Sequence, residues 1–198
     1  MTQESTPQDQ NPQESPGLLG QNELVLQQST GLLSNDFDIT DPQDRVVGRV
    51  ESQGSALGRM FLGTRSLMLT DADGTPLLSI RDPHDLGLDR YELRSPDGEH
   101  LIAQLQRKLA FFRTNAWIDV GDQQMQLEGE VLNFDFRMVL GETVVATISR
   151  QWGGVGRGLL GHSRYGLSIH PEAPTRDRLA IIGGVVALDL IRAKQKDS

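Results

Sequence analysis

The sequence predicts a mainly β fold, an antiparallel β-barrel of about twelve strands that encloses a hydrophobic C-terminal α-helix. Alternating apolar runs joined by turn residues recur five times between residues 37 and 148, which is typical of β-hairpins. No convincing helical periodicity precedes residue 175. The segment 179–191, LAIIGGVVALDLI, is apolar on every side, as in a helix surrounded by protein or by membrane.

Each of the five repeats predicts one hairpin, because Asp-Gly and Pro-Asp-Gly between alternating apolar runs are strong hairpin signals. Two further runs, 24–28 and 165–169, bring the total to about twelve strands. A sheet of that size curls, and closing it into a barrel removes its edges. Its interior is then too wide for its own side chains to fill. The predicted turns are 41–44, 71–74, 95–98, 121–122 and 141–142.

The apolar segment 179–191 can fill that interior. Its thirteen residues reach roughly 20 Å as a helix, whereas a bilayer core needs roughly 30 Å, so burial in protein is favoured. Small residues recur at helical spacing and form a slim face that strands can approach closely. We predict a central helix over about 176–194. The small residues are Ala180, Gly183, Gly184 and Ala187.

The net charge of -8 is located in the leading part of the chain. Residues 1–44 contain eight acids and no Lys or Arg, whereas the remainder has nineteen of each sign. A neutral body argues against a general nucleic-acid binder. Residues 1–20 are rich in Gln, Pro, Ser and Glu and are predicted to be a disordered acidic tail that contacts a protein partner or aids solubility. The barrel domain is predicted over 21–196.

Cysteine is absent from the chain. Disulfides and thiolate metal sites are therefore excluded, which fits a reducing cytoplasm. The N-terminus has no basic region followed by an apolar run, so no signal peptide is visible. We expect a cytoplasmic protein.

The segment from Arg150 onward resembles the C-terminal part of phospholipid scramblase-like proteins. The resemblance rests on Arg150, Trp152, Gly153 and Gly154, on the apolar run 179–188, and on Asp189. The hairpins at 91–120, YELRSPDGEHLIAQLQRKLAFFRTNAWIDV, resemble the repeats of the LURP-one-related family. Both families share the tubby C-terminal-like fold, a twelve-stranded barrel around a central helix, and the resemblance covers roughly residues 20–194.

This resemblance implies a scramblase-like module that binds anionic phospholipid headgroups peripherally, at the inner face of the plasma membrane, and influences transbilayer lipid distribution. The alternative is a non-enzymatic cytoplasmic scaffold barrel of the LURP-one type that binds a ligand or a protein. Animal scramblases carry an acylated cysteine cluster and an acidic calcium segment. This chain has no Cys, and residues 162–177 lack clustered carboxylates, so neither calcium nor another cofactor is expected.

Basic residues beside apolar loops are the candidates for headgroup binding. Arg107, Lys108 and Arg113 flank the run 109–112, and Arg157 and Arg164 bracket the glycine-rich segment 156–161. A guanidinium can bind phosphate oxygens bidentately, and apolar neighbours can enter the headgroup zone. For any single residue the simpler reading, an ordinary solvated charge, is favoured. A real site requires these five residues to converge on one rim.

Asp189 stands within the apolar helix, where a carboxylate is costly unless it is paired. We predict a structural ion pair with Arg192 at i+3 or with a barrel arginine.

Other motifs predict no chemistry. Segment 156–161 matches G-x-G-x-x-G but has no βαβ context, and 71–74 begins like a calcium loop but has Pro76 where that loop needs Gly. No nucleophile elbow is present, so we expect no enzyme. The histidines lack metal-ligand spacing, so no metal site is expected either. They are His84, His100, His162 and His170.

Overall fold

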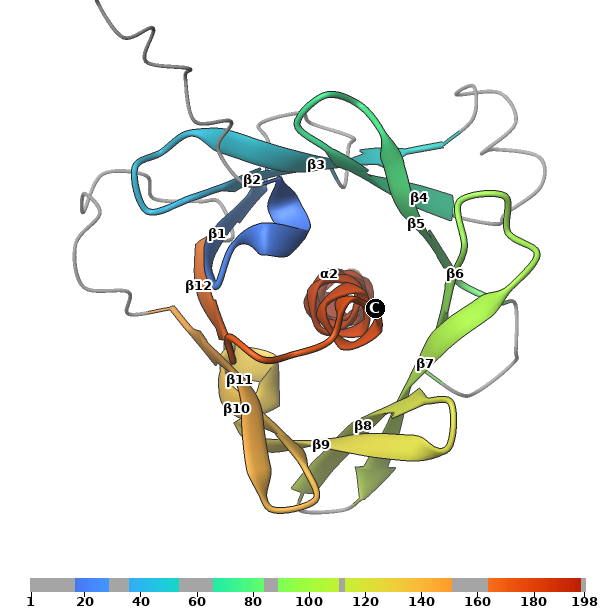
Figure 1. The fold of residues 1–198 in the computed structure, drawn as a ribbon. Helices are drawn as coiled ribbons and strands as arrows, with labels where there is room; N and C mark the ends of the chain where they lie inside the picture. Colours follow the sequence, from blue (N-terminus) through green and yellow to red (C-terminus); the bar gives the residue numbers. More distant parts are fainter. Residues whose placement is uncertain are drawn as a thin grey trace, which may run out of the picture.

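A computed structural model describes residues 17–28, 36–53, 66–83, 89–110, 113–150 and 164–196. The described residues form twelve antiparallel strands that close into one barrel, with a single long helix along its axis (Figure 1). The predicted fold class is confirmed. The elements are η1 Leu18–Gly20, β1 Glu23–Gln28, β2 Phe37–Thr40, β3 Val46–Ser52, β4 Ser66–Asp71, β5 Pro76–Arg81, β6 Asp89–Arg94, β7 Leu101–Ala110, β8 Arg113–Val120, β9 Gln123–Glu130, η2 Val131–Asn133, β10 Asp135–Leu140, β11 Thr143–Ser149, β12 Arg164–Ile169 and α2 Thr175–Lys196.

All five predicted hairpins are confirmed, and strands that follow one another along the chain are neighbours in the barrel. The remaining pair, β1 with β12, closes the ring through the register Glu23 to Ser168. Buried and more exposed residues alternate along β2, β4 and β9, as expected of strands with one face on the core. β1, β5 and β12 each bury three residues in a row. Gly98, in the β6–β7 turn, has a φ of +80°, a conformation that glycine adopts without the steric cost of a Cβ.

Asp41 holds the β2–β3 turn. Its side chain is 1% exposed, and it accepts hydrogen bonds from the backbone N–H groups of Gln43 and Arg45 at 2.9 and 3.0 Å and from Arg45 Nε at 2.7 Å. Burial acts to raise the pKa of Asp41, but the hydrogen bonds from Arg45 and Gln43 outweigh it and lower the pKa. The carboxylate therefore stays ionised and supports the turn at neutral pH.

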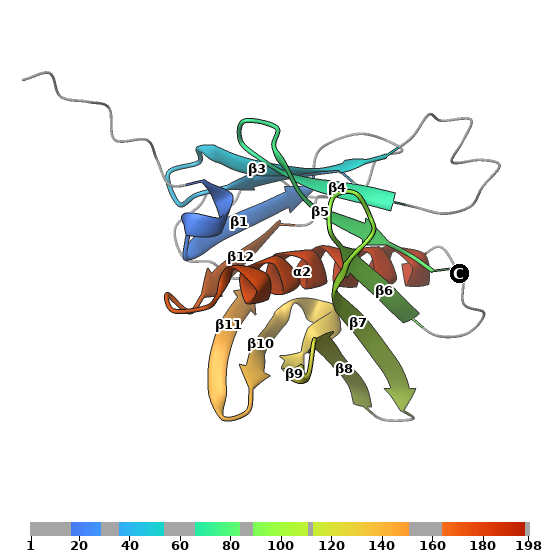
Figure 2. The same ribbon diagram turned by 45° about the vertical axis from the view of Figure 1, so that its right-hand side comes forward.

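The helix α2 lies inside the barrel, as predicted, and Figure 2 shows strands on both sides of it. The residues from Ala180 to Ile191 that carry side chains are at most 5% exposed. A Cβ on Gly183 would lie 2.6 Å from Leu78 Cδ2, and one on Gly184 would lie 2.4 Å from Ile118 Cδ1. The small face of the helix is therefore where the wall comes closest. No helix in the described part of the chain is long and apolar enough to cross a membrane.

The predicted tail ends earlier than residue 20, which corrects its boundary. Leu18 is fully buried in η1, and its backbone N–H donates to Asp71 Oδ1 at 3.0 Å. The physical reason is the adjacent apolar pair Leu18 and Leu19, since Leu18 fills space beside Gly48, where a Cβ would lie 2.8 Å from Leu18 Cδ2. Residues 1–16 lie outside the described residues, and so does the predicted disorder there.

Arg178, in the first turn of α2, is buried at 6% exposure, and its guanidinium is hydrogen-bonded to the segments around it. Its guanidinium donates to the carbonyls of Ala173 and Pro171 at 2.9 Å each, and to that of His170 at 3.3 Å. It also reaches the segment before β1, donating to Gln21 O at 2.8 Å and Asn22 Oδ1 at 2.7 Å. One side chain thus joins the helix, the 170–174 connection and the start of the barrel.

Candidate functional site

The end of the barrel where α2 terminates contains the predicted site residues that the structure describes, and we call it the helix-exit end. The hydroxyl of Tyr165, at the start of β12, donates to Asp189 near the end of α2, which places both at this end. Because neighbouring strands are antiparallel, β7 ends and β8 begins at the same end.

At the helix-exit end the β7–β8 ladder runs on beyond its described pairings with β6 and β9, while β9 continues to Glu130 in its pairing with β10. The pairs Lys108–Asn115, Leu109–Thr114 and Ala110–Arg113 belong to this ladder. Among the described residues, the pairing of β6 with β7 stops at Arg107, and that of β9 with β8 stops at Ala116. We call residues 108–110 and 113–115 the β7–β8 extension. Figure 2 shows β7 running beyond β6.

The structure divides the five headgroup candidates. Lys108 and Arg113 belong to the β7–β8 extension. Arg107 lies at its base and is 4% exposed, on the inward face of β7. Arg164 begins β12, four strands from β8 around the ring, and its Nη2 lies 3.3 Å from Asp44 Oδ1 in an exposed pair. Arg157 lies outside the described residues.

The basic candidates therefore converge on one part of the rim only in part. Lys108 and Arg113 share one strand pair, with Arg107 beside it but turned inward. β12, which begins with Arg164, lies on the other side of α2 from β7 (Figure 1). Sequence spacing could not separate these groups, because a barrel brings every second loop to the same end and spreads the loops around its rim.

Asp189 is buried, at 5% exposure, and Tyr165 donates its hydroxyl to it. Sequence reasoning missed this tyrosine, which precedes the carboxylate by 24 residues. The guanidinium of Arg192, the partner expected at i+3, lies over the ring of Phe134 with Cζ 5.7 Å from the centroid. The ion pair stays a prediction.

Phe134 contacts both Tyr165 and Arg192 at the helix-exit end. Its ring stacks on Tyr165 with centroids 4.0 Å apart and an interplanar angle of 14°. Its backbone has φ +56° and ψ +45°, which is uncommon for a bulky residue. The ring is held between Tyr165 and Arg192, and these contacts offset the conformational cost.

Replacing Tyr165 by phenylalanine should lower the free energy of unfolding by about 1–2 kcal/mol, because the ring contacts remain while a buried carboxylate loses a donor. Urea unfolding followed by far-ultraviolet circular dichroism measures the change. Tyr165→Leu, which also removes the stacked ring, should cost more. Equal stabilities of the wild type and Tyr165→Phe would mean that the Tyr165 hydroxyl does not hold Asp189.

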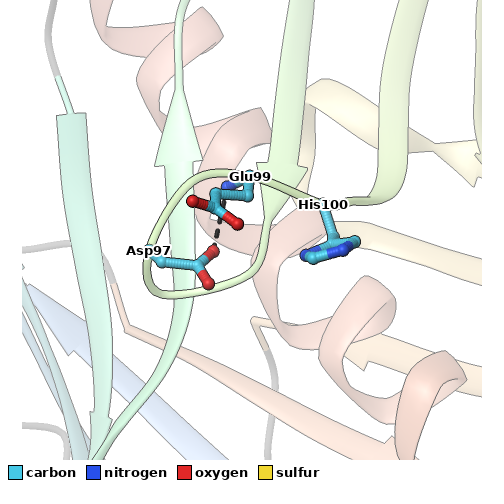
Figure 3. A group of neighbouring side chains, drawn as sticks. All are labelled: Asp97, Glu99 and His100. Carbon is cyan, nitrogen blue, oxygen red and sulfur yellow. Dashed lines mark hydrogen bonds between the residues drawn. The ribbon is translucent and has the colours of Figure 1, made fainter.

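A second polar group occupies the β6–β7 turn, at the opposite end of the barrel. Asp97, Glu99 and His100 offer donor atoms within 4.8 Å of one another, and all three are exposed (Figure 3). Asp97 accepts from the Ser95 hydroxyl and from Glu99 N at 2.9 Å, and these bonds lower the pKa of Asp97. Its carboxylate is thereby engaged in forming the turn.

Two cations also oppose metal binding at this turn. Arg94 Nη1 donates to Gly98 O at 3.2 Å. A Cβ built on Gly98 would lie 2.1 Å from Arg81 Nη2, so that guanidinium is against the turn. Positive charge so close disfavours a further cation. The group is therefore best explained as the hydrogen-bonding frame of a hairpin turn.

Three comparisons identify the relatives of this chain. A sequence model of the LURP-one-related (LOR) family matches residues 22–189. The uncharacterized protein YxjI of Bacillus subtilis (strain 168) is 25% identical over 130 residues, which make up 66% of this chain and 74% of YxjI. The X-ray structure of the Arabidopsis thaliana protein AT5G01750 shares the fold, with a TM-score of 0.57 at 17% identity over 89% of this chain and 99% of that one. Since the family match spans the barrel from the residue before β1 to Asp189, this chain belongs to the LURP-one-related family.

Proposed function

We propose that this LURP-one-related barrel is a non-enzymatic module that binds anionic phospholipid headgroups peripherally. The observation that carries the proposal is the β7–β8 extension, which lies at the helix-exit end and contains Lys108 and Arg113. These two residues flank the run Leu-Ala-Phe-Phe at 109–112. Basic residues beside an apolar or aromatic run are typical of segments that bind the headgroup zone of a membrane.

The charge distribution around the extension supports an anionic partner. Residues 100–118 contain three Lys or Arg and no Asp or Glu, although the whole chain carries a net charge of -8. Each basic residue near an anionic bilayer contributes about 1 kcal/mol of attraction, which decays within a Debye length. Local charge therefore decides the orientation of approach even though the molecule as a whole is acidic.

The proposal concerns binding at one membrane surface. We place the protein at the inner face of the plasma membrane, where anionic lipid is abundant. An effect on transbilayer lipid distribution would be a separate activity, and a lipid-flip assay in the same vesicles reads it independently of binding.

Co-sedimentation with phosphatidylcholine vesicles, with and without phosphatidylserine, tests the proposal. We expect binding only to the anionic vesicles, with weakening at high salt. The double variant Lys108→Gln/Arg113→Gln should bind about thirtyfold more weakly, because two basic contacts at about 1 kcal/mol each are removed.

Arg49→Gln/Arg137→Gln is the matched control. It removes the same charge from exposed arginines of β3 and β10, which pair with Asp38 and Glu128. This control should bind like the wild type. Equal loss in both double variants would indicate a net-charge effect, and the absence of binding to anionic vesicles at low salt would refute the proposal.

The second candidate function is a cytoplasmic protein-binding scaffold. The concentration of eight acids and no base in residues 1–44 favours it, since an acidic segment can contact a basic partner. The vesicle assay distinguishes the two functions. A headgroup-binding module binds the anionic vesicles more tightly than the neutral ones, whereas a protein-binding scaffold shows no such difference.

A further inference from the structure

We infer that Trp117 anchors this protein at the membrane interface, so that the outer face of the β7–β8 ladder lies against the bilayer. The inference rests on the proposed function and adds the orientation and the anchoring side chain. Its occupant is a phospholipid bilayer that contains anionic lipid.

Trp117 lies on the outer face of β8. Its neighbours along the strand, Ala116 and Ile118, are 4% and 0% exposed, so they face the core and Trp117 between them faces outward. The indole side chain is partly exposed. Trp117 is in register with Gln106 of β7 and Gln126 of β9.

The surface around Trp117 is polar, and Asp119, two residues along β8, is engaged by amides. Asp119 accepts hydrogen bonds from Gln106 Nε2 at 2.9 Å and from Gln124 Nε2 at 2.8 Å. Gln106 Nε2 also donates to Gln104 Oε1 at 3.0 Å. The indole thus stands in a polar field of side-chain amides, and the carboxylate of Asp119 already accepts two hydrogen bonds. Such a polar field is compatible with the hydrated headgroup zone.

The register connects Trp117 with the basic residues of the extension. Strand alternation puts positions 113 and 117 of β8 on the same face of the ladder, and positions 106 and 108 pair with 117 and 115 on that face. Lys108, Arg113 and Trp117 therefore occupy one face of two adjacent strands. Trp is the residue that prefers the boundary between headgroups and acyl chains, because its large ring is apolar and its N–H remains hydrogen-bonded.

Fluorescence of a single-tryptophan protein tests the inference. The chain has two tryptophans, and Trp152→Phe leaves Trp117 as the reporter. With vesicles of phosphatidylcholine and phosphatidylserine we expect a blue shift of its emission and quenching by brominated acyl chains. Neutral phosphatidylcholine vesicles should produce neither change.

Truncation of the side chain supplies the second readout. Trp117→Ala should weaken binding to the same anionic vesicles about tenfold, the loss expected when roughly 60 Å² of apolar contact is withheld from the interface. Leu101→Ala is the matched control. It shortens an apolar side chain of β7 that is 49% exposed at the opposite end of the barrel, and it should bind normally.

The outcomes separate this inference from the proposed function. Normal vesicle binding by the Trp152→Phe protein, with no emission shift and no quenching, would overturn the role of Trp117 and leave headgroup binding intact. Failure of the wild-type protein to bind anionic vesicles would overturn both. A shift together with the tenfold loss supports the anchor, even if Trp117→Ala is less stable, because the shift is measured with residue 117 intact.

Discussion

Replacing Arg178 by methionine should lower the free energy of unfolding by about 4 kcal/mol, since four backbone carbonyls and the Asn22 side chain lose a charged donor at once, all in part-buried bonds. For a chain of this length the midpoint of thermal unfolding should fall by about 12 °C. Methionine retains much of the apolar stem, so lost hydrogen bonds rather than lost volume dominate. Differential scanning calorimetry and urea unfolding measure both quantities.

Two variants test the cause of that loss. Arg178→Lys keeps the charge but has no planar fork, so it should recover only part of the stability. Arg176→Met removes the neighbouring arginine, which is exposed and contacts Ile102 O at 3.2 and 3.4 Å, and it should change stability by less than about 1 kcal/mol. Equal losses at 176 and 178 would contradict the anchoring role of the buried guanidinium.

Substitution of leucine for Gly184 should destabilise the fold by about 3 kcal/mol, the upper part of the usual cost of overpacking a core. Even the first added atom would lie 2.4 Å from Ile118 Cδ1. Ile118 is fully buried, so it has little room to move. Urea unfolding monitored by circular dichroism gives the free energy.

A graded series separates packing from helix propensity. Gly184→Ala should cost about 1 kcal/mol, less than the leucine variant, because the gain in helix propensity offsets only part of the overlap of its Cβ with Ile118 Cδ1. Ala193→Leu, at a partly exposed position of the same helix, should cost less than about 1 kcal/mol. If Gly184→Leu were as stable as Ala193→Leu, the close approach of helix and wall would be wrong.

The sequence alone predicts the barrel because its signals are local. Each hairpin depends on residues within a few positions of its turn, as in the Ser-Pro-Asp-Gly turn at 95–98, where Gly98 adopts the expected positive φ. The central helix is equally local, since an all-apolar segment with a small face at 180, 183, 184 and 187 has to be buried. The start of the folded domain at Leu18 was harder to predict, because a three-residue 3-10 helix is too short to show a periodic pattern of apolar residues.

The candidate site was predictable only in part. Lys108 and Arg113 are close in sequence, so the β7–β8 ladder keeps them together. Alternation in the run from Leu101 already indicates that position 107 faces inward. Arg107 was instead grouped with Lys108 and Arg113, because all three flank the apolar run 109–112. Arg164 shares the rim with them but not the wall, because β9, β10 and β11 lie between β8 and β12.

What the sequence determined by itself is the set of strands, their hairpin pairing, the buried helix and the acidic leading segment, since each depends on short-range patterns of polarity and turn chemistry. Only the tertiary structure decided which residues meet across the closed barrel. Tyr165 reaches Asp189, Arg178 reaches Gln21 and Asn22, and Arg192 lies over Phe134. These partners are far apart along the chain, and ring closure with one particular register is what brings them into contact.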